Sequence, residues 1–308
     1  MITLVSYYSI IQSSLQMHRI GFHVSISGSI SNSIKNAENI KCTAFQIFTR
    51  NPRGWTAKHL DINDVEEYKR KINSSFINKN DVVVHMPYLP NLAAPENDFY
   101  FKSRNVLAEE IIRCSTLDIP YVILHLGSHL GTGTSNGISQ IVNACNYAID
   151  NYMSSYKRHL PVNILLENSA GQKNSVGQKF EEIKIILEKL DNKKIGVCFD
   201  TCHAFASGYD LRTSENVIQT LDIFNDTIGI SNLKILHLND SKGAFNQNKD
   251  RHEHIGLGSI GKMGFQAILR NKYFKNIPII METPVDKIRG DKENMEYVLQ
   301  LLESSTIR

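Results

Sequence analysis

The sequence predicts a single closed (β/α)8 barrel, the TIM barrel fold. Three observations support this prediction: eight short apolar runs, helical patterns between them, and a length of 308 residues, which is common for one α/β barrel. Each run is rich in Val, Ile, Leu and Phe, as expected of a strand that is buried on both faces of a parallel sheet. The runs cover residues 19–24, 43–48, 82–85, 121–126, 162–167, 195–200, 233–238 and 278–282.

Apolar residues between the runs recur at steps of three or four, the spacing of one helix face. This spacing occurs in three sets: Leu107, Ile111, Cys114 and Leu117; Ile141, Cys145, Ala148 and Tyr152; and Phe180, Ile183, Leu187 and Leu190. The alternation of strand and helix indicates βα units. An open, doubly wound sheet is the alternative, because a strand count from sequence can be wrong by one or two. No Pro-, Gly- or Ser-rich linker divides the chain, so we expect one domain over residues 18–308.

Composition indicates a globular protein but leaves its partners open. Hydrophobic residues make up 42% of the chain and charged residues 21%, which argues against a disordered protein. The formal net charge of +3 does not indicate nucleic-acid binding by itself, because a basic surface must be clustered to attract a polyanion. Residues 1–17 carry no charge and lack the features of a signal peptide or a membrane span. We interpret them as a poorly ordered tail ahead of the barrel.

The cysteines argue against secretion. The chain has five, an odd number, at Cys42, Cys114, Cys145, Cys198 and Cys202. A chain of this length does not need disulfides to be stable, and no disulfide framework is legible in the spacing. We therefore expect a reducing intracellular compartment, such as the cytoplasm, the nucleus, a viral factory or a virion.

Seven of the eight predicted strands carry an imidazole or a carboxylate at their carboxyl ends. The second strand, which ends at Phe48 and Thr49, is the exception; the others carry His23, His85, His125, Glu167, Asp200, His237 and Glu282. In a (β/α)8 barrel these ends meet on the face that holds the active site. One such histidine alone is more often structural, but seven buried ionisable groups are costly unless a metal or a substrate compensates them.

The residue types favour a transition metal. Imidazole nitrogen together with carboxylate oxygen suits zinc, manganese or iron, whereas magnesium and calcium prefer oxygen alone. If the chain turns into a helix after the sixth strand, Asp200 and His203 lie on neighbouring sides of the turn. Asp250 and His252, two positions apart, project to one side of an extended segment. We expect the side chain of Cys202 to point away from these ligands and to pack.

The candidate metal ligands are therefore nine: His85, His125, Glu167, Asp200, His203, His237, Asp250, His252 and Glu282. One zinc ion takes about four ligands, so nine suit two or three ions that share a bridging carboxylate. Such clusters are suited to phosphoester hydrolysis, because one pair of ions can activate a water and another ion can neutralise the departing alkoxide.

The segments that carry these residues resemble the endonuclease IV family of zinc-dependent apurinic/apyrimidinic endonucleases (AP endonuclease family 2). The resemblance extends from about residue 19 to about residue 302 and is most specific in the segment that follows the sixth strand. The matching segments are 21–25 (GFHVS), 48–55 (FTRNPRGW), 125–129 (HLGSH), 166–172 (LENSAGQ), 197–210 (VCFDTCHAFASGYD), 237–242 (HLNDSK), 250–252 (DRH) and 282–284 (ETP).

The resemblance implies three zinc ions. His85 and His125 would hold the first, and Glu167 would bridge it to the second and take part in catalysis. Asp200, His237 and Glu282 would complete the second site. The set His203, Asp250 and His252 would hold the third. His23 is not among the ligands that the family implies, so we expect it to lie beside them or to face the substrate.

The resemblance also implies a substrate. A monomer would cut duplex DNA on the 5′ side of an abasic site, leaving a 3′-hydroxyl and a 5′-deoxyribose phosphate, as part of base excision repair. By motif position, Arg53, Tyr88 and Leu89 would enter the DNA at the lesion, where lost pairing lowers the cost of distortion. Other basic residues in loops on the same face are expected to contact phosphates: Arg50, Lys242 and Arg251, with Lys173 and Arg212 as further candidates.

Two other classes remain as alternatives. A sugar isomerase or epimerase of the same barrel superfamily also gathers His, Asp and Glu around a divalent metal, but such enzymes use one or two ions. The pair Asp250 and His252 therefore argues against it. A catalytically inactive nucleic-acid-binding or structural protein is disfavoured because all nine candidate ligands are present.

Overall fold

The computed structural model describes residues 18–157, 159–191 and 194–303. Eight parallel strands are hydrogen-bonded in the order β1-β10-β7-β6-β5-β4-β3-β2. These strands are β1 (Ile20–Phe22), β2 (Phe45–Ile47), β3 (Val82–His85), β4 (Tyr121–His125), β5 (Asn163–Glu167), β6 (Ile195–Asp200), β7 (Leu233–His237) and β10 (Ile279–Met281). Each strand falls within one of the eight predicted runs or coincides with it. The predicted tail over residues 1–17 lies outside the described residues.

The sheet closes into a barrel where β1 meets β2. In place of a regular ladder, this seam has an isolated bridge that pairs His23 with Gln46 and a few backbone hydrogen bonds. Val24 N–H donates to the Gln46 carbonyl at 2.8 Å, and the N–H groups of residues 43 and 44 donate to the carbonyl of residue 20 at 2.8 and 3.2 Å. The two strands approach so closely that a Cβ on Gly21 would lie 1.7 Å from the carbonyl oxygen of Ala44, which only glycine allows. The closed barrel confirms the predicted fold and excludes the open, doubly wound sheet.

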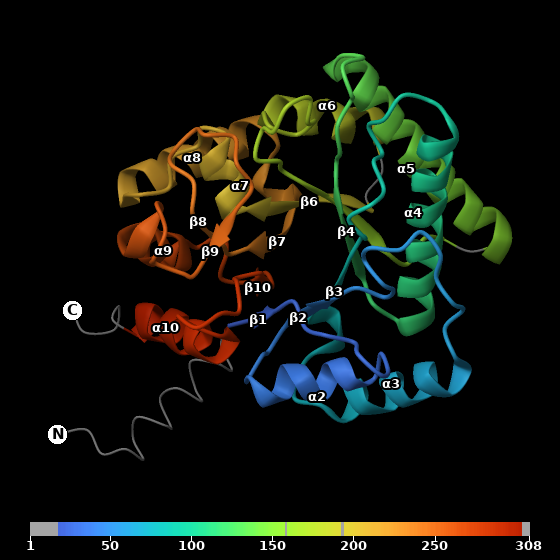
Figure 1. Cartoon of the computed structure of the whole chain (residues 1–308), viewed down its shortest axis with the longest axis horizontal. Helices are drawn as coiled ribbons and strands as arrows, with labels where there is room; N and C mark the ends of the chain where they lie inside the picture. Colours follow the sequence, from blue (N-terminus) through green and yellow to red (C-terminus); the bar gives the residue numbers. More distant parts are fainter. Residues whose placement is uncertain (1–17, 158, 192–193, 304–308) are drawn as a thin grey trace.

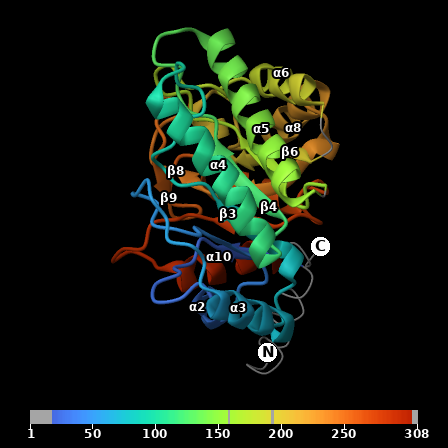
Figure 2. The same cartoon turned by 90° about the vertical axis from the view of Figure 1, so that its right-hand side faces the viewer.

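Helices surround the strands on the outside (Figures 1 and 2). They are α2 (Asn32–Asn39), α3 (Ile62–Ser74), α4 (Asp98–Leu117), α5 (Thr134–Tyr156), α6 (Phe180–Leu190), α7 (Thr201–Ala206), α8 (Ser214–Thr227), α9 (Gly261–Arg270) and α10 (Asp291–Glu303), with short 3-10 turns at Lys79–Asp81 and Ile230–Asn232. The three predicted helix faces lie in α4, α5 and α6 and pack inward, with Leu187 only partly buried. Within the described part of the chain, no helix combines the length and apolar character needed to cross a bilayer.

The interior of the barrel is a packed floor rather than a pore. Seven side chains without exposed surface, one from each strand or strand start except β1, form this floor layer: Ala44, Val83, Ile123, Leu165, Cys198, Ile235 and Ile280. Because residues two apart in a strand point to the same side, the residue two positions beyond each floor residue also faces the barrel axis. A larger cluster fills the space between the strands and the helices.

Candidate metal centre

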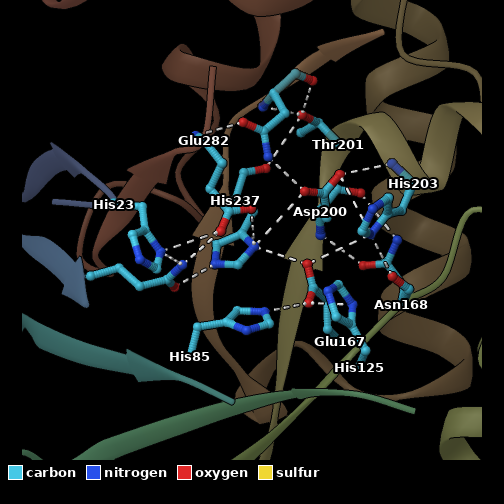
Figure 3. A network of polar contacts seen from close by, with 12 residues as sticks. His23, His85, His125, Glu167, Asn168, Asp200, Thr201, His203, His237 and Glu282 are labelled. Carbon is cyan, nitrogen blue, oxygen red and sulfur yellow. Dashed lines mark hydrogen bonds and ion pairs between the residues drawn. The ribbon is translucent and has the colours of Figure 1, made fainter. Parts of the chain in front are cut away.

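A second layer of side chains lies above the floor, at the carboxyl ends of the strands. Together with His23 of the β1 end, the residues two positions beyond the floor form this mouth layer: His23, Gln46, His85, His125, Glu167, Asp200, His237 and Glu282. All seven ionisable residues that end the predicted strands are therefore in it. Figure 3 shows these seven converging on one small volume.

Glu167 is at the centre of the cluster and is almost fully buried. Its Oε2 lies 3.1 Å from His85 Nε2 and 3.1 Å from His125 Nδ1, and its Oε1 lies 2.9 Å from His237 Nδ1. The two carboxylate oxygens therefore face different histidines. This is the arrangement that a carboxylate bridging two ions requires.

A second ligand group forms around His237. Its Nδ1 is 2.9 Å from Glu167 Oε1, 3.4 Å from Glu282 Oε2 and 3.8 Å from Asp200 Oδ2. One ligand atom from each of these four residues lies within 4.8 Å of the other three. Three carboxylates around one imidazole nitrogen form a strongly negative pocket that a cation would neutralise.

The third group lies between the start of α7 on one side and a short β-hairpin on the other. Asp200 caps α7 by accepting the His203 N–H at 2.7 Å, so that His203 lies in the first turn of this helix, beside the site. On the other side, β8 (Asp240–Ser241) pairs with β9 (His252–Glu253) in a short antiparallel hairpin. The buried Asp240 carboxylate accepts backbone N–H groups from residues 256, 258, 260 and 261, which holds the following loop against this hairpin.

In the third group, two buried imidazole nitrogens have no hydrogen-bond partner among the described residues. His203 Nε2 and His252 Nε2 lie 3.2 and 3.5 Å from Asp250 Oδ1. Both nitrogens are buried and have no hydrogen-bond partner of acceptable geometry among the described residues. The Nδ1 atoms of the same rings face carbonyl oxygens of residues 168 and 282, at 2.9 and 3.1 Å. A ring that donates from Nδ1 presents a lone pair at Nε2, so this donor set fits a bound cation.

The electrostatics of the metal-free cluster support the same conclusion. Burial by itself would raise the pKa of Glu167, but His125 and His237 hold it well below its usual value. Burial would lower the pKa of His237, yet Cys198, Glu282 and Glu167 raise it well above its usual value. In Glu282, burial is likewise outweighed by His237 and His85, and the pKa falls to about 2. The neighbouring carboxylates thus favour the protonated form of His237, so a metal ion would compete with a proton at this residue.

Two thiols lie at the edges of the cluster. Cys198 lies with Glu167 and His237, and Cys202 with Asp200 and His252, each set having ligand atoms within 4.8 Å of one another. The expectation that Cys202 points away from the ligands is therefore wrong: the turn of α7 brings its Sγ near them. Burial raises the pKa of Cys198 to about 12 and that of Cys202 still further, so both thiols are neutral in the metal-free protein.

The nine candidate ligands thus lie in three adjacent groups, two of which share Glu167. Sequence reasoning missed three buried amides among them. Asn239 Nδ2 donates to Asp200 Oδ2 at 2.7 Å, and Asn168 Nδ2 donates to the Asp200 carbonyl at 3.0 Å. Gln46 is the β2 member of the mouth layer and contacts His23, His237 and Glu282. Only the alternation of side chains along β2 could have identified Gln46, because an amide gives no ligand signal of its own.

The loops around the mouth carry the residues predicted to contact DNA. Tyr88 is 60% exposed and packs edge-on against Phe48, with ring centroids 5.2 Å apart. It lines a pocket of about 510 Å³ together with residues of the mouth layer. Its N–H donates to the Pro52 carbonyl at 3.2 Å, which ties its loop to the loop that presents the exposed Arg53. Leu89 is half-buried beside it.

The basic residues differ in their surroundings. Lys242 and Arg251 are exposed beside the β8–β9 hairpin, where Lys242 Nζ lies 3.9 Å from Glu253. Arg50 is instead buried, and its guanidinium pairs with Glu110 and Glu109 of α4. The charge of Arg50 is thus engaged inside the protein, which argues against the predicted contact with phosphate.

The chain is similar both to a broad class of TIM barrels and to one family within it. A family model described as a xylose isomerase-like TIM barrel matches residues 34–305, in agreement with the fold. A protein of Nitrosopumilus maritimus (strain SCM1) described as a probable endonuclease 4 is 52% identical over 278 residues, which cover 90% of this chain and 97% of that protein. The chain belongs to the endonuclease IV family, and the predicted resemblance is confirmed.

Solved structures agree with this assignment. The crystal structure of endonuclease IV from Thermus thermophilus superposes with a TM-score of 0.80 at 29% identity, covering 93% of this chain and all of that one. A D-tagatose 3-epimerase-like protein superposes with a TM-score of 0.69 at 19% identity, covering 93% of this chain and 97% of that one. A likeness at this lower identity shows the shared barrel alone and does not favour the epimerase alternative.

Proposed function

We propose that this protein is a metal-dependent AP endonuclease. It would hydrolyse the phosphodiester 5′ to an abasic site in duplex DNA and leave a 3′-hydroxyl and a 5′-deoxyribose phosphate. The observation that carries the proposal is the set of three adjacent ligand groups at the carboxyl ends of the strands, in a chain whose relatives are described as probable endonuclease 4. A DNA repair role follows from this substrate.

The ligand groups support a centre of three zinc ions. His85 and His125 would hold one ion, Glu167 would bridge it to a second ion held with Asp200, His237 and Glu282, and the set His203, Asp250 and His252 would hold a third. When bound, the ions would activate water for attack on phosphorus and neutralise the departing oxygen. The chain itself orients His85 and His203 through backbone carbonyls and Asp200 through a buried amide.

The mouth of the barrel offers a one-sided approach for the substrate. The floor layer has no exposed surface, so a phosphate can reach the cluster only from the mouth, where His125 and Asp250 are each 39% exposed in their side chains. We propose that Tyr88, Leu89 and Arg53 enter the duplex at the lesion, and that Lys242 and Arg251 bind flanking phosphates.

The compartment and the oligomeric state also stay proposals. All five cysteines are buried and free of disulfides, which supports function in a reducing compartment. We propose a monomer, because one barrel carries all the candidate metal ligands and all the residues proposed to contact DNA.

The decisive experiment uses a labelled duplex with one tetrahydrofuran abasic analogue. We expect a single nick on the 5′ side of the analogue, a 3′ end that a DNA polymerase extends, and loss of nicking after treatment with a chelator, restored by Zn²⁺. An intact duplex of the same sequence is the control. A zinc-loaded protein that leaves the abasic duplex uncut, or one that contains a single Mn²⁺ and epimerises ketoses, would show that the proposal is wrong.

Substitution of the lesion-sensing side chains should reduce selectivity without emptying the metal centre. For Arg53→Ala and Tyr88→Ala we expect the preference for abasic over intact duplex to fall by about 10-fold or more, since each wedge contact contributes roughly 1–3 kcal/mol. Metal content, measured by plasma emission, should stay at the wild-type value. Phe76 is 65% exposed and offers a control, Phe76→Ala, that should not change the preference. Unchanged selectivity in both variants would contradict the wedge role.

A further inference from the structure

Gln46 is the one member of the mouth layer that carries neither an imidazole nor a carboxylate. It lies on β2, two residues after the floor residue Ala44, and has no exposed surface. A buried amide requires hydrogen bonds from both its oxygen and its nitrogen, since an unsatisfied polar group costs about 1–3 kcal/mol. The hydrogen-bond partners of Gln46 therefore indicate what this residue does.

The hydrogen bonds of the Gln46 side chain reach the cluster and His23. Its Oε1 lies 2.9 Å from His237 Nε2. Its Nε2 lies 2.6 Å from Glu282 Oε1 and 2.9 Å from His23 Nδ1. The carboxylate of Glu282 can only accept, so the amide nitrogen faces it and the amide oxygen faces His237.

This orientation determines the state of His237. The amide oxygen accepts a hydrogen bond from His237 Nε2–H, so the neutral ring carries its hydrogen there and presents a lone pair at Nδ1. That Nδ1 is the atom surrounded by Glu167, Glu282 and Asp200. In the same way, the amide N–H occupies Oε1 of Glu282 and leaves Oε2, 3.4 Å from His237 Nδ1, facing the same pocket.

We propose that Gln46 is a positioning residue for the metal site formed by Glu167, Asp200, His237 and Glu282. One amide fixes the tautomer of the histidine ligand and the rotation of a carboxylate ligand. Partners of this kind typically change metal affinity by about 10–100-fold when removed. Because the amide is neutral, it orients His237 without adding a fourth negative charge to a pocket that already holds three carboxylates. The inference rests on the proposed metal centre and assigns Gln46 no contact with substrate.

Two substitutions separate hydrogen bonding from packing. Gln46→Met keeps a similar volume but leaves the His237 N–H and the Glu282 Oε1 without a partner. Gln46→Glu keeps the shape but places an acceptor 2.6 Å from Glu282 Oε1, where the wild type has a donor. Gln140→Met is the matched control, because Gln140 is also a nearly buried glutamine but lies on α5, outside the barrel.

The test measures zinc binding rather than catalysis alone. Metal-free protein is titrated with Zn²⁺ against a chromophoric chelator, and Co²⁺-loaded protein is compared by its visible absorption spectrum. For both Gln46 variants we expect the affinity for one of the bound zinc ions to fall about 10–100-fold and the Co²⁺ spectrum to change. We expect Gln140→Met to match the wild type in both measurements. In nicking assays, kcat should fall while KM for the abasic duplex stays within about twofold.

Two outcomes would overturn the inference. One is wild-type zinc affinity with an unchanged Co²⁺ spectrum in Gln46→Met, even if that variant is less stable to heat, because Gln46 would then only fill space. The other is wild-type affinity in Gln46→Glu, which would show that the donated hydrogen bond is not needed. Failure of the proposed nuclease activity is distinguishable, because the zinc titration compares variants without any DNA.

Discussion

Glu167→Gln should lower the rate of abasic-site nicking by about 10³-fold or more, which corresponds to roughly 4 kcal/mol of lost transition-state stabilisation. The substitution replaces the carboxylate whose two oxygens face His85 and His125 on one side and His237 on the other. An amide of the same shape offers one acceptor instead of two and no charge. It therefore cannot bridge two cations.

Single-turnover nicking kinetics and metal analysis would measure this effect. Binding of the abasic duplex should weaken far less than nicking, because the proposed DNA contacts lie in loops around the carboxyl ends of the strands. Glu188→Gln is the control, since Glu188 is a solvent-exposed residue of α6 with a side chain 63% exposed. Nicking at the wild-type rate by Glu167→Gln would refute its assignment as the bridging ligand.

Glu110→Gln should destabilise the protein by about 3–5 kcal/mol, because it leaves the buried guanidinium of Arg50 without its buried counter-charge. Glu110 has no exposed surface and accepts hydrogen bonds from Arg50 and from the Thr49 hydroxyl at 2.6 Å. Burial raises the pKa of Glu110 although Arg50 opposes that rise. The intact pair is therefore costly to bury and adds little net stability, but losing half of it is strongly destabilising.

Urea unfolding followed by circular dichroism would measure this change. Glu109→Gln is a matched control, because Glu109 pairs with the same arginine at 2.9 Å but its side chain is 56% exposed. We expect that variant to lose no more than about 1 kcal/mol. If Glu110→Gln unfolded at the wild-type urea concentration, Arg50 would not depend on this partner, and a role for it at the DNA surface would have to be reconsidered.

The barrel and the residues of the cluster could both be predicted from the sequence, because both depend on strand register. Apolar runs locate the strands, and the ionisable residue at each carboxyl end shares a side with the floor residue two positions before it. His85 after Val83 and Glu167 after Leu165 are examples. Convergence of these ends then follows from closure of the barrel.

Other features depended on packing that no local pattern encodes. Arg50 and Arg53 are three residues apart in one loop, yet one is buried against α4 and the other is exposed. Which of them turns inward depends on Glu110, which is distant in the chain. Gln46 was missed because β2 ends at Ile47, whereas the apolar run continues to Phe48 and placed the strand end too late.

The seam between β1 and β2 links the metal centre to the motions of the barrel. It is joined by an isolated bridge and a few backbone hydrogen bonds rather than by a regular ladder, so opening fluctuations of the closed sheet should begin there. The side chain of Gln46 crosses this seam, since it contacts His23 at the end of β1 and Glu282 just beyond β10. A ligand that binds only the closed barrel suppresses its opening by mass action. Binding of metal ions at the candidate centre would therefore slow hydrogen exchange of the Val24 amide. An ion bound near β7 would in this way stabilise the seam between β1 and β2.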